Sequence, residues 1–119
     1  MDEKETIAAL AALAQQTRLQ TFRLLVRCEP EGIPAGELAR MIGVPQNTMS
    51  NHLAILLQAG LVTDERQGRS ILYRADFDTL RALTLYLLKD CCGGRADLCQ
   101  PLIDDLTGCA SACAPAAKN

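Results

Sequence analysis

The fold is decided by the stretch PAGELARMIGVPQNTMSNHLAILLQAG, which runs from Pro34 to Gly60. A short helix is predicted from Pro34 to Met41, because the N–H that proline lacks would have no partner in the first turn of a helix. Gly43 ends this helix, and a longer one is predicted from Gln46 to Gln58, with Gly60 as its C-terminal cap. Two helices around a short turn that contains glycine indicate a helix-turn-helix unit.

The longer helix has an apolar and a polar side. Its inward residues recur at helical spacing and are Met49, Leu53, Leu56 and Leu57. Its outward residues near the start are polar and are Gln46, Asn47, Ser50 and Asn51. Asn and Gln can pair with both the donor and the acceptor of adenine in the major groove, so these four residues are predicted to bind DNA. The alternative is an ordinary solvated helix face.

A β-hairpin is predicted from Leu61 to Ala75, around a turn at Gln67-Gly68, because apolar and polar residues alternate in the second half of this segment. Arg66 and Arg69 flank the glycine and are predicted to grip phosphate or to enter the minor groove. A plain exposed hairpin is the alternative. The helix-turn-helix unit directly before it favours a DNA-binding wing.

Three further helices are predicted around this centre. The first has an apolar face of Ile7, Leu10, Ala11 and Ala14, and the second, from Thr17 to Arg27, has one of Leu19, Phe22, Leu25 and Val26. The last is predicted from Asp76 to Cys91 and has apolar residues on more than one side, with Phe77, Leu80, Leu83 and Leu87 on one side and Leu85, Tyr86 and Leu88 nearby. One side suits the core and another suits a second copy, so the first and last helices are predicted to form the interface of a symmetric homodimer. Deep burial of the last helix within its own subunit is the alternative.

Length and charge are compatible with one DNA-binding domain. The 119 residues are enough for a single core, and the fold class is predicted as mainly α with a small β-hairpin, a winged helix-turn-helix. Residues 1–91 would form the DNA-binding and dimerisation domain, and residues 92–119 a tail that contains cysteines. The net charge of −2 argues weakly against nucleic acid, but residues 35–60 carry only Glu37 and Arg40 and can approach phosphate.

The expected location is the cytoplasm. No apolar run reaches the roughly 20 residues that a membrane span needs, and the acidic start lacks the pattern of an export signal. Cysteines in such a compartment stay reduced, so their clustering indicates ligand binding or redox sensing rather than a disulfide framework.

Five short motifs occur in a characteristic order: Gln16-Thr17-Arg18-Leu19, Gly36-Glu37-Leu38-Ala39, Ser50-Asn51-His52-Leu53, Ala59-Gly60-Leu61-Val62, and Arg66-Gln67-Gly68-Arg69 through Tyr73. Together they resemble the ArsR/SmtB family of metalloregulatory repressors. The resemblance implies a homodimeric repressor that leaves its operator DNA when a metal ion or metalloid binds. It also implies that His52 lies in the recognition helix and contacts phosphate or a neighbouring helix.

Two sensing sites known from this family do not fit the chain. The segment Glu37-Leu38-Ala39-Arg40-Met41 contains no cysteine, so an arsenic site before the recognition helix is excluded. The last helix contains no histidine and offers only Asp76, Asp78 and Asp90 as oxygen ligands, so a zinc site of the family's last-helix type is not expected.

A thiolate site is predicted at the end of the last helix instead. Cys91 and Cys92 are neighbours there, and Gly93-Gly94 lets the chain fold back and bring Cys99 toward them. Three soft thiolates suit As(III), or Sb(III), whereas zinc prefers four ligands, and cadmium or lead remain alternatives. Some arsenic-responsive family members have a similar Cys-Cys pair and downstream cysteine. We therefore expect an arsenite-responsive repressor. Cysteines without partners in a tail are the alternative.

The remaining cysteines leave other interpretations open. Cys109 and Cys113 are either accessory ligands or without a role, and the second is favoured. Cys28 fits a packing residue, but relatives of this family can pair such a cysteine with one on the last helix, which gives a rival redox- or persulfide-sensing repressor that uses Cys28 with Cys91 or Cys92. A metal-buffering protein or thiol oxidoreductase is disfavoured because Cys-x-x-Cys is absent. No constellation supports catalysis, so an enzyme is not expected.

Overall fold

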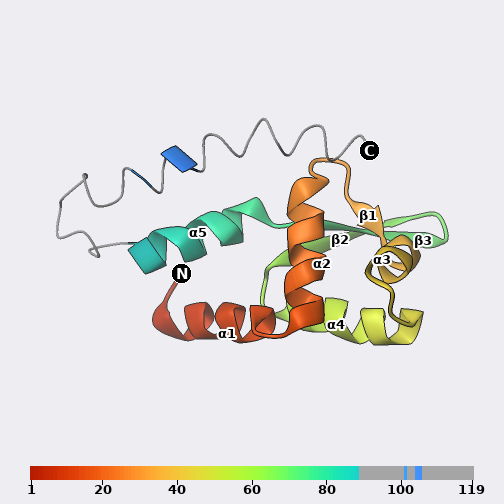
Figure 1. Ribbon diagram of the computed structural model, residues 1–119, viewed down its shortest axis with the longest axis horizontal. Coiled ribbons are helices and arrows are strands. Elements are labelled where there is room, and N and C mark those ends of the chain that lie inside the picture. Colours follow the sequence, from red (N-terminus) through yellow and green to blue (C-terminus); the bar gives the residue numbers. More distant parts are fainter. Residues whose placement is uncertain (89–100, 102–103, 106–119) are drawn as a thin grey trace.

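The computed structural model describes residues 1–88, 101 and 104–105 (Figure 1). Its elements are α1 (Glu3–Leu13), α2 (Gln16–Arg27), β1 (Ile33–Pro34), α3 (Ala35–Ile42), α4 (Gln46–Gln58), β2 (Val62–Gln67), β3 (Ser70–Ala75) and α5 (Phe77–Leu88). This is a winged helix-turn-helix, mainly α with a small sheet, and the predicted fold class is confirmed.

The helix-turn-helix consists of α3 and α4. Gly43 adopts a positive φ of 87°, which lets the chain leave α3 sharply. The prediction for α3 was one residue early at both ends, because Pro34 has an extended ψ of 151° and stands outside the helix as its cap. The bounds of α4 agree with the prediction. Its end is closed by two hydrogen bonds of 3.0 Å each, in which Leu61 N–H donates to Leu56 O and Gly60 N–H to Leu57 O.

The wing is the antiparallel hairpin β2–β3, which pairs Val62 with Ala75 at its base and Gln67 with Ser70 at its tip. The turn contains Gly68 and Arg69, one residue later than predicted. A third strand, β1, pairs antiparallel with β3, and the strand order is β1-β3-β2. The sequence did not indicate β1, because two residues are too few to show an alternating pattern.

One core lies between α2, α3, α4 and the base of the wing. Its fully buried large side chains are Leu25, Leu38, Met49, Leu53, Leu56 and Leu61, together with Thr21. The predicted inward face of α4 is confirmed for Met49, Leu53 and Leu56, while Leu57 is half-buried at the edge of the core.

Several predicted apolar faces point away from this core. Helix α1 buries Thr6, Ala9 and Ala12, whereas the apolar face predicted for it is exposed and includes Ile7 (59% exposed) and Leu10 (41%). On α5 only Leu83 is buried, and Phe77 and Leu87 are exposed. Leu19, predicted inward on α2, is also exposed. Apolar periodicity identified these helices, but it does not distinguish a side that meets the core from one that does not.

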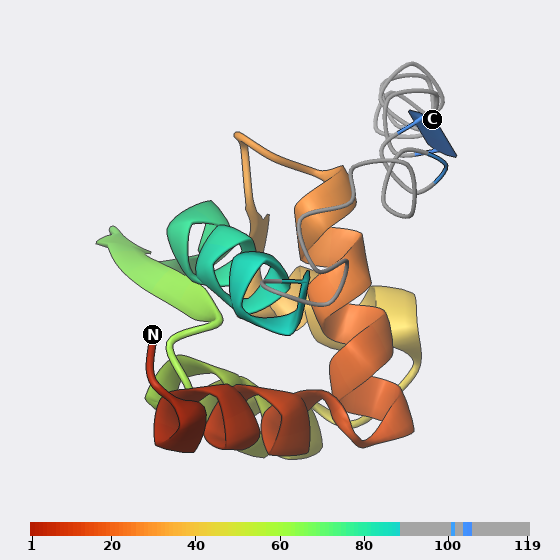
Figure 2. The same ribbon diagram turned by 90° about the vertical axis from the view of Figure 1, so that its left-hand side faces the viewer.

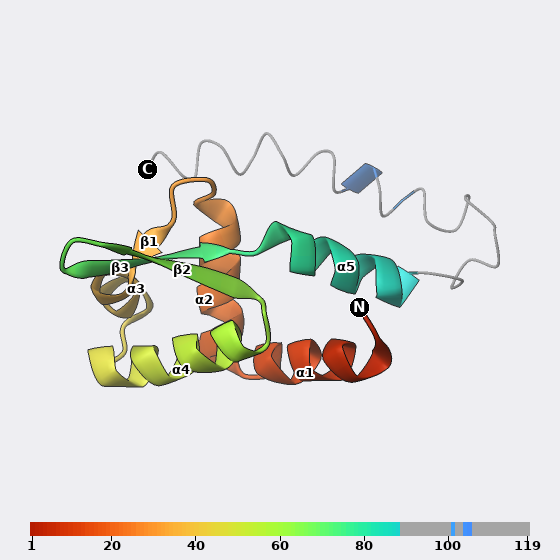
Figure 3. The ribbon, with the colours of Figure 1, turned by 180° about the vertical axis from the view of Figure 1, so that it is seen from behind.

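The elements divide the molecule into two ends. Helices α1 and α5 lie at one end, and the wing, α3 and the N-terminal part of α4 lie at the other (Figures 1 and 3). Figure 2 looks at the molecule from the α1 end and shows α5 running above α1. None of the helices in the described part of the chain is long and apolar enough to cross a membrane.

Candidate nucleic-acid interface

The outward face of α4 is a polar, exposed surface. Gln46, Asn47, Ser50 and Asn51 are all exposed. The Asn47 side-chain oxygen accepts a hydrogen bond of 3.0 Å from Thr48 N–H, and within residues 1–88 no side-chain hydrogen bond occupies the other three. Their donors and acceptors are therefore available to a partner that lies along the N-terminal half of α4.

His52 follows these residues on α4 and contacts a different helix. Its Nδ1 lies 3.4 Å from an Arg18 side-chain nitrogen on α2. A guanidinium has no acceptor, so this contact is a hydrogen bond in the imidazole tautomer that carries its N–H at Nε2. The contact of His52 with phosphate remains a prediction. Arg18 lies within the first of the five family motifs, and no local sequence pattern links it to His52.

The wing carries two arginines without a bonding partner in the described structure. Arg66 lies in β2 opposite Ile71, and Arg69 lies in the turn after Gly68, which has a φ of 64°. Both side chains are exposed. Along the described wing, these are the cations that remain free to meet a phosphate.

The third arginine of the wing, Arg74, is engaged within the molecule. Its guanidinium lies 2.6 Å from a carboxylate oxygen of Glu65 and donates a second hydrogen bond of 2.9 Å to Pro30 O. The hydrogen bond and the charge of Arg74 lower the pKa of Glu65. Burial in the sheet, and then the charge of Asp64, raise the pKa of Tyr73. Through Pro30, Arg74 ties the wing to the loop before β1 rather than offering its charge to a ligand.

The predicted sulfur site cannot be placed on this framework. Cys91, Cys92 and Cys99, together with Cys109, Cys113 and Asp90, lie outside the described residues. Among the residues that are described, no three His, Cys, Asp or Glu side chains come together as a metal site. Asp76 caps the start of α5, where its carboxylate accepts a 3.2 Å hydrogen bond from Thr79 N–H. Cys28 is a free, half-buried thiol at the end of α2, beside the core.

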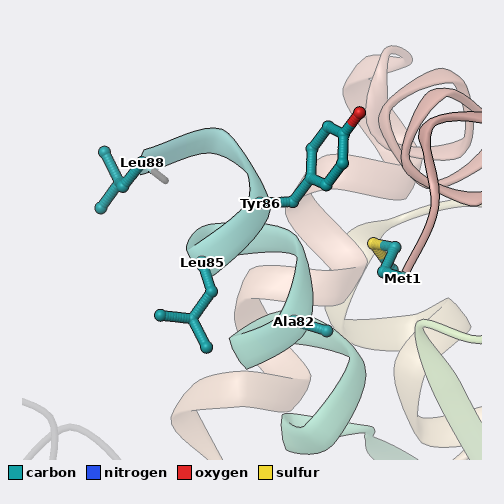
Figure 4. A pocket seen from close by; sticks show the side chains of 5 residues that line it. All are labelled: Met1, Ala82, Leu85, Tyr86 and Leu88. Atoms are coloured by element: carbon teal, nitrogen blue, oxygen red, sulfur yellow. The ribbon is translucent and has the colours of Figure 1, made fainter. Parts of the chain in front are cut away.

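The other end of the molecule has an apolar surface. A groove of about 550 Å³ is lined by Met1, Ala82, Leu85, Tyr86 and Leu88 (Figure 4). Ala82 and Tyr86 extend toward Met1, and Leu85 and Leu88 extend away from it. Leu85 is 61% exposed and Tyr86 38%. Exposed apolar side chains thus lie on sides of α5 that do not pack against the core of the subunit.

Known proteins share both the sequence and the fold. A family model described as a helix-turn-helix domain matches residues 13–65. The repressor SmtB from Mycobacterium tuberculosis is 41% identical over 70 residues, which cover 59% of this chain and 47% of SmtB. The regulator YgaV from Escherichia coli is 34% identical over 73 residues, which cover 59% of this chain and 74% of YgaV. The chain belongs to the ArsR/SmtB family of winged helix-turn-helix transcriptional regulators.

The family fold is also seen in solution. A homodimeric winged helix-turn-helix DNA-binding domain, fragment 1–100 of Mb0332 from Mycobacterium bovis and a possible ArsR-family regulator, superimposes with a TM-score of 0.60 at 28% identity. The match covers 71% of this chain and 77% of that one. The match with this chain spans about half the length of SmtB, 47%.

Proposed function

We propose that this protein is a homodimeric transcriptional repressor that binds operator DNA and releases it when As(III), or Sb(III), binds the thiolates of Cys91, Cys92 and Cys99. The observation that carries the proposal is the arrangement of two different surfaces at opposite ends of one small fold. Polar α4 side chains and free wing arginines occupy one end, and exposed apolar helices occupy the other.

The first surface suits duplex DNA. The N-terminal residues of a recognition helix meet base edges in the major groove, where Asn and Gln can bind adenine through two hydrogen bonds. Gln46, Asn47, Ser50 and Asn51 are exposed on that part of α4. Arg66 and Arg69 supply positive charge for the phosphates, which sets the position of a protein on DNA.

The second surface suits a second copy of the chain. Exposed apolar side chains include Ile7 and Leu10 on α1 and Leu85, Tyr86 and Leu87 on α5. A twofold interface uses the same patch on both subunits, so an apolar patch can bury itself against its copy. Such a dimer would present two recognition helices about one DNA turn, roughly 34–36 Å, apart.

The inducer follows from the chemistry of the donor set. Cys91, Cys92 and Cys99 follow α5 in the sequence and supply soft thiolates without a histidine, which favours As(III) or Sb(III) over zinc. Because α5 carries part of the apolar surface, ligand binding by the cysteines that follow it in the sequence is suited to shift the dimer geometry. A coupling of about 1–3 kcal/mol would weaken operator binding by roughly 5- to 150-fold.

Fluorescence anisotropy of a labelled operator duplex tests the proposal. The reduced protein is titrated in parallel with arsenite, zinc, cadmium and a persulfide donor. We expect arsenite to release the DNA, Cys92→Ser to bind DNA but to ignore arsenite, and the control Cys28→Ser to respond as the wild type does.

Three outcomes would overturn parts of this proposal. A Cys92→Ser protein that responds at wild-type arsenite doses would refute the thiolate site. Release by the persulfide donor alone, lost in Cys28→Ser, would establish the rival redox sensor that uses Cys28 with Cys91 or Cys92. A wild-type protein that binds no DNA would refute the repressor function.

A further inference from the structure

Arg18 joins three helices through one side chain and its own backbone. Its backbone N–H donates to the side-chain oxygen of Gln15 at 2.9 Å, at the start of α2. Its Nε donates to Ala12 O, in the last turn of α1, at 2.6 Å. A terminal guanidinium nitrogen lies 3.4 Å from His52 Nδ1 on α4. Helices α1 and α4 are thus bridged by one half-buried cation.

The chemistry of this bridge suits both of its acceptors. The last carbonyl groups of a helix have no partner within it, and the negative end of the helix dipole attracts a cation. The planar guanidinium directs its donors in a fixed fork, so binding Ala12 O limits the directions in which His52 can be bound. A lysine would offer a single flexible ammonium in its place.

The surface between α1 and α4 has a groove beside Arg18. It has a volume of about 470 Å³ and is lined by Ala8, Ala11, Ala12, Arg18, Ile55, Gln58 and Ala59. Ala9 and Ala12 of α1 are buried in the same core as Leu53 and Leu56 of α4. Apolar packing therefore holds the two helices together, and the hydrogen bonds of Arg18 add a directional constraint on the angle between them.

We infer that Arg18 is a positioning residue that holds the recognition helix α4 at a fixed angle to α1 and so sets the spacing of the two recognition helices in the dimer. This inference rests on the proposed function. Arg18 acts through His52 and Ala12, and its guanidinium is committed to them rather than to a DNA phosphate.

Salt dependence separates positioning from phosphate binding. A labelled duplex is selected from a random pool by the wild-type protein, and its affinity for Arg18→Met is measured at several salt concentrations. Methionine keeps much of the apolar stem and removes the donors. We expect affinity to fall about tenfold, which corresponds to about 1.4 kcal/mol. We expect an unchanged salt slope, and an unchanged dimerisation constant by sedimentation.

Arg23→Met is the matched control, because Arg23 is an exposed α2 arginine without a bonding partner among the described residues. It should bind DNA as the wild type does. If the slope of log affinity against log salt is smaller by about one in Arg18→Met, Arg18 contacts a phosphate and the inference is overturned. Wild-type affinity in Arg18→Met would overturn it as well.

A pair of His52 variants tests the bridge from its other side, and it also serves if Arg18→Met does not fold. In His52→Asn the side-chain oxygen takes roughly the place of Nδ1 and can accept from Arg18, whereas the amide of His52→Gln sits one atom farther out. We expect His52→Asn to bind the selected duplex about fivefold more tightly than His52→Gln, and this difference to vanish in Arg18→Met, as for residues that act as one unit.

If His52→Asn and His52→Gln bind the selected duplex equally tightly while Arg18 is unchanged, the bridge is refuted. If the wild type enriches no duplex, the proposed function fails and the inference fails with it. If the wild type binds while Arg18→Met and Arg23→Met behave alike, only the inference fails.

Discussion

At the scale of single residues, the wing arginines differ in what they bind. Arg69 has no acceptor in the described structure, whereas Arg74 is held by Glu65 and Pro30. We expect Arg69→Ala to weaken DNA binding on every sequence and to lower the slope of log affinity against log salt by about one. Anisotropy titrations at several salt concentrations measure both.

Asn51→Ala provides the contrast, because an exposed α4 amide is suited to bases rather than phosphates. Asn51→Ala should lose about 1–3 kcal/mol of binding free energy for the selected duplex and little for unrelated DNA. If Arg69→Ala leaves the salt slope unchanged, Arg69 of the wing does not contact a phosphate.

Among the glycines of residues 1–88, Gly32 is the one whose replacement should cost most. It has a φ of 79°, and a Cβ there would lie 2.7 Å from Tyr73 O and 2.8 Å from Arg74 Cγ. Gly68 also has a positive φ, 64°, but a Cβ there meets nothing within 4 Å. We expect Gly68→Ala to lose about 1–2 kcal/mol of unfolding free energy from backbone strain. Gly32→Ala should lose a further amount of about 1–3 kcal/mol from the clash.

Urea unfolding of the two glycine variants measures the difference. Equal losses would mean that the loop before β1 shifts without cost, and that the close approach of Gly32 to β3 is not a fixed contact.

Exposure of the predicted α4 residues could be read from the sequence, but the Arg18 bridge could not. Asn47 and Asn51 fall on the side of α4 away from the leucines, so the helical period places them outside. Gln46 lies on the side of Leu53, seven residues later, and is exposed as the first residue of the helix. Arg18 and His52 meet because α2 crosses α4, and no spacing between two distant residues encodes a crossing. The cysteine site remains a prediction, since Cys91, Cys92 and Cys99 lie outside the described residues.

At the scale of elements, the contact of Arg74 with Glu65 ties β3 to β2 and should depend on pH. Arg74 lowers the pKa of Glu65 from the ordinary 4.5 through its hydrogen bond and its charge. Because the pKa of Glu65 is lower in the folded state, its ionised carboxylate stabilises the fold at pH values above the pKa of the unfolded state. That contribution is lost as the pH falls through the pKa of the folded state. We expect Glu65→Gln to reduce stability slightly at about pH 7 and to have no effect in strong acid.

A double-mutant cycle with Arg74→Met supplies the control for this element. Once Arg74 is gone, Glu65→Gln should leave stability unchanged at either pH in urea unfolding. A Glu65→Gln effect that persists in the Arg74→Met protein would assign it to something other than this pair.

The elements themselves were predictable to different degrees. Capping signals defined α4 at both ends, because Pro45 precedes it and Gly60 follows it. The hairpin turn was placed one residue early, since Gly68 takes the first of the two turn positions. Strand β1 exists only through its pairing with β3, which is a tertiary contact and leaves no local pattern.

At the scale of the whole molecule, the apolar end predicts self-association. Leu85 and Leu87 on α5 are 61% and 51% exposed. We expect Leu85→Glu or Leu87→Glu to shift the protein toward monomer in analytical ultracentrifugation, because a buried interface does not tolerate an unpaired charge. Leu19→Glu is the control, since Leu19 is a 43% exposed leucine on a different helix, α2. Equal dissociation in all three variants would refute the assignment of the interface to α5.

The order of the small sheet, β1-β3-β2, has a consequence for how copies of this chain avoid one another. Both outer strands present backbone groups that could join a neighbour's sheet and grow into aggregates. On one side, β2 carries Asp64, Glu65 and Arg66 in succession. On the other side, β1 has only two residues, and one is Pro34, which has no N–H to donate. Uncontrolled strand addition is thereby discouraged, and encounters between copies are left to the helical end of the molecule.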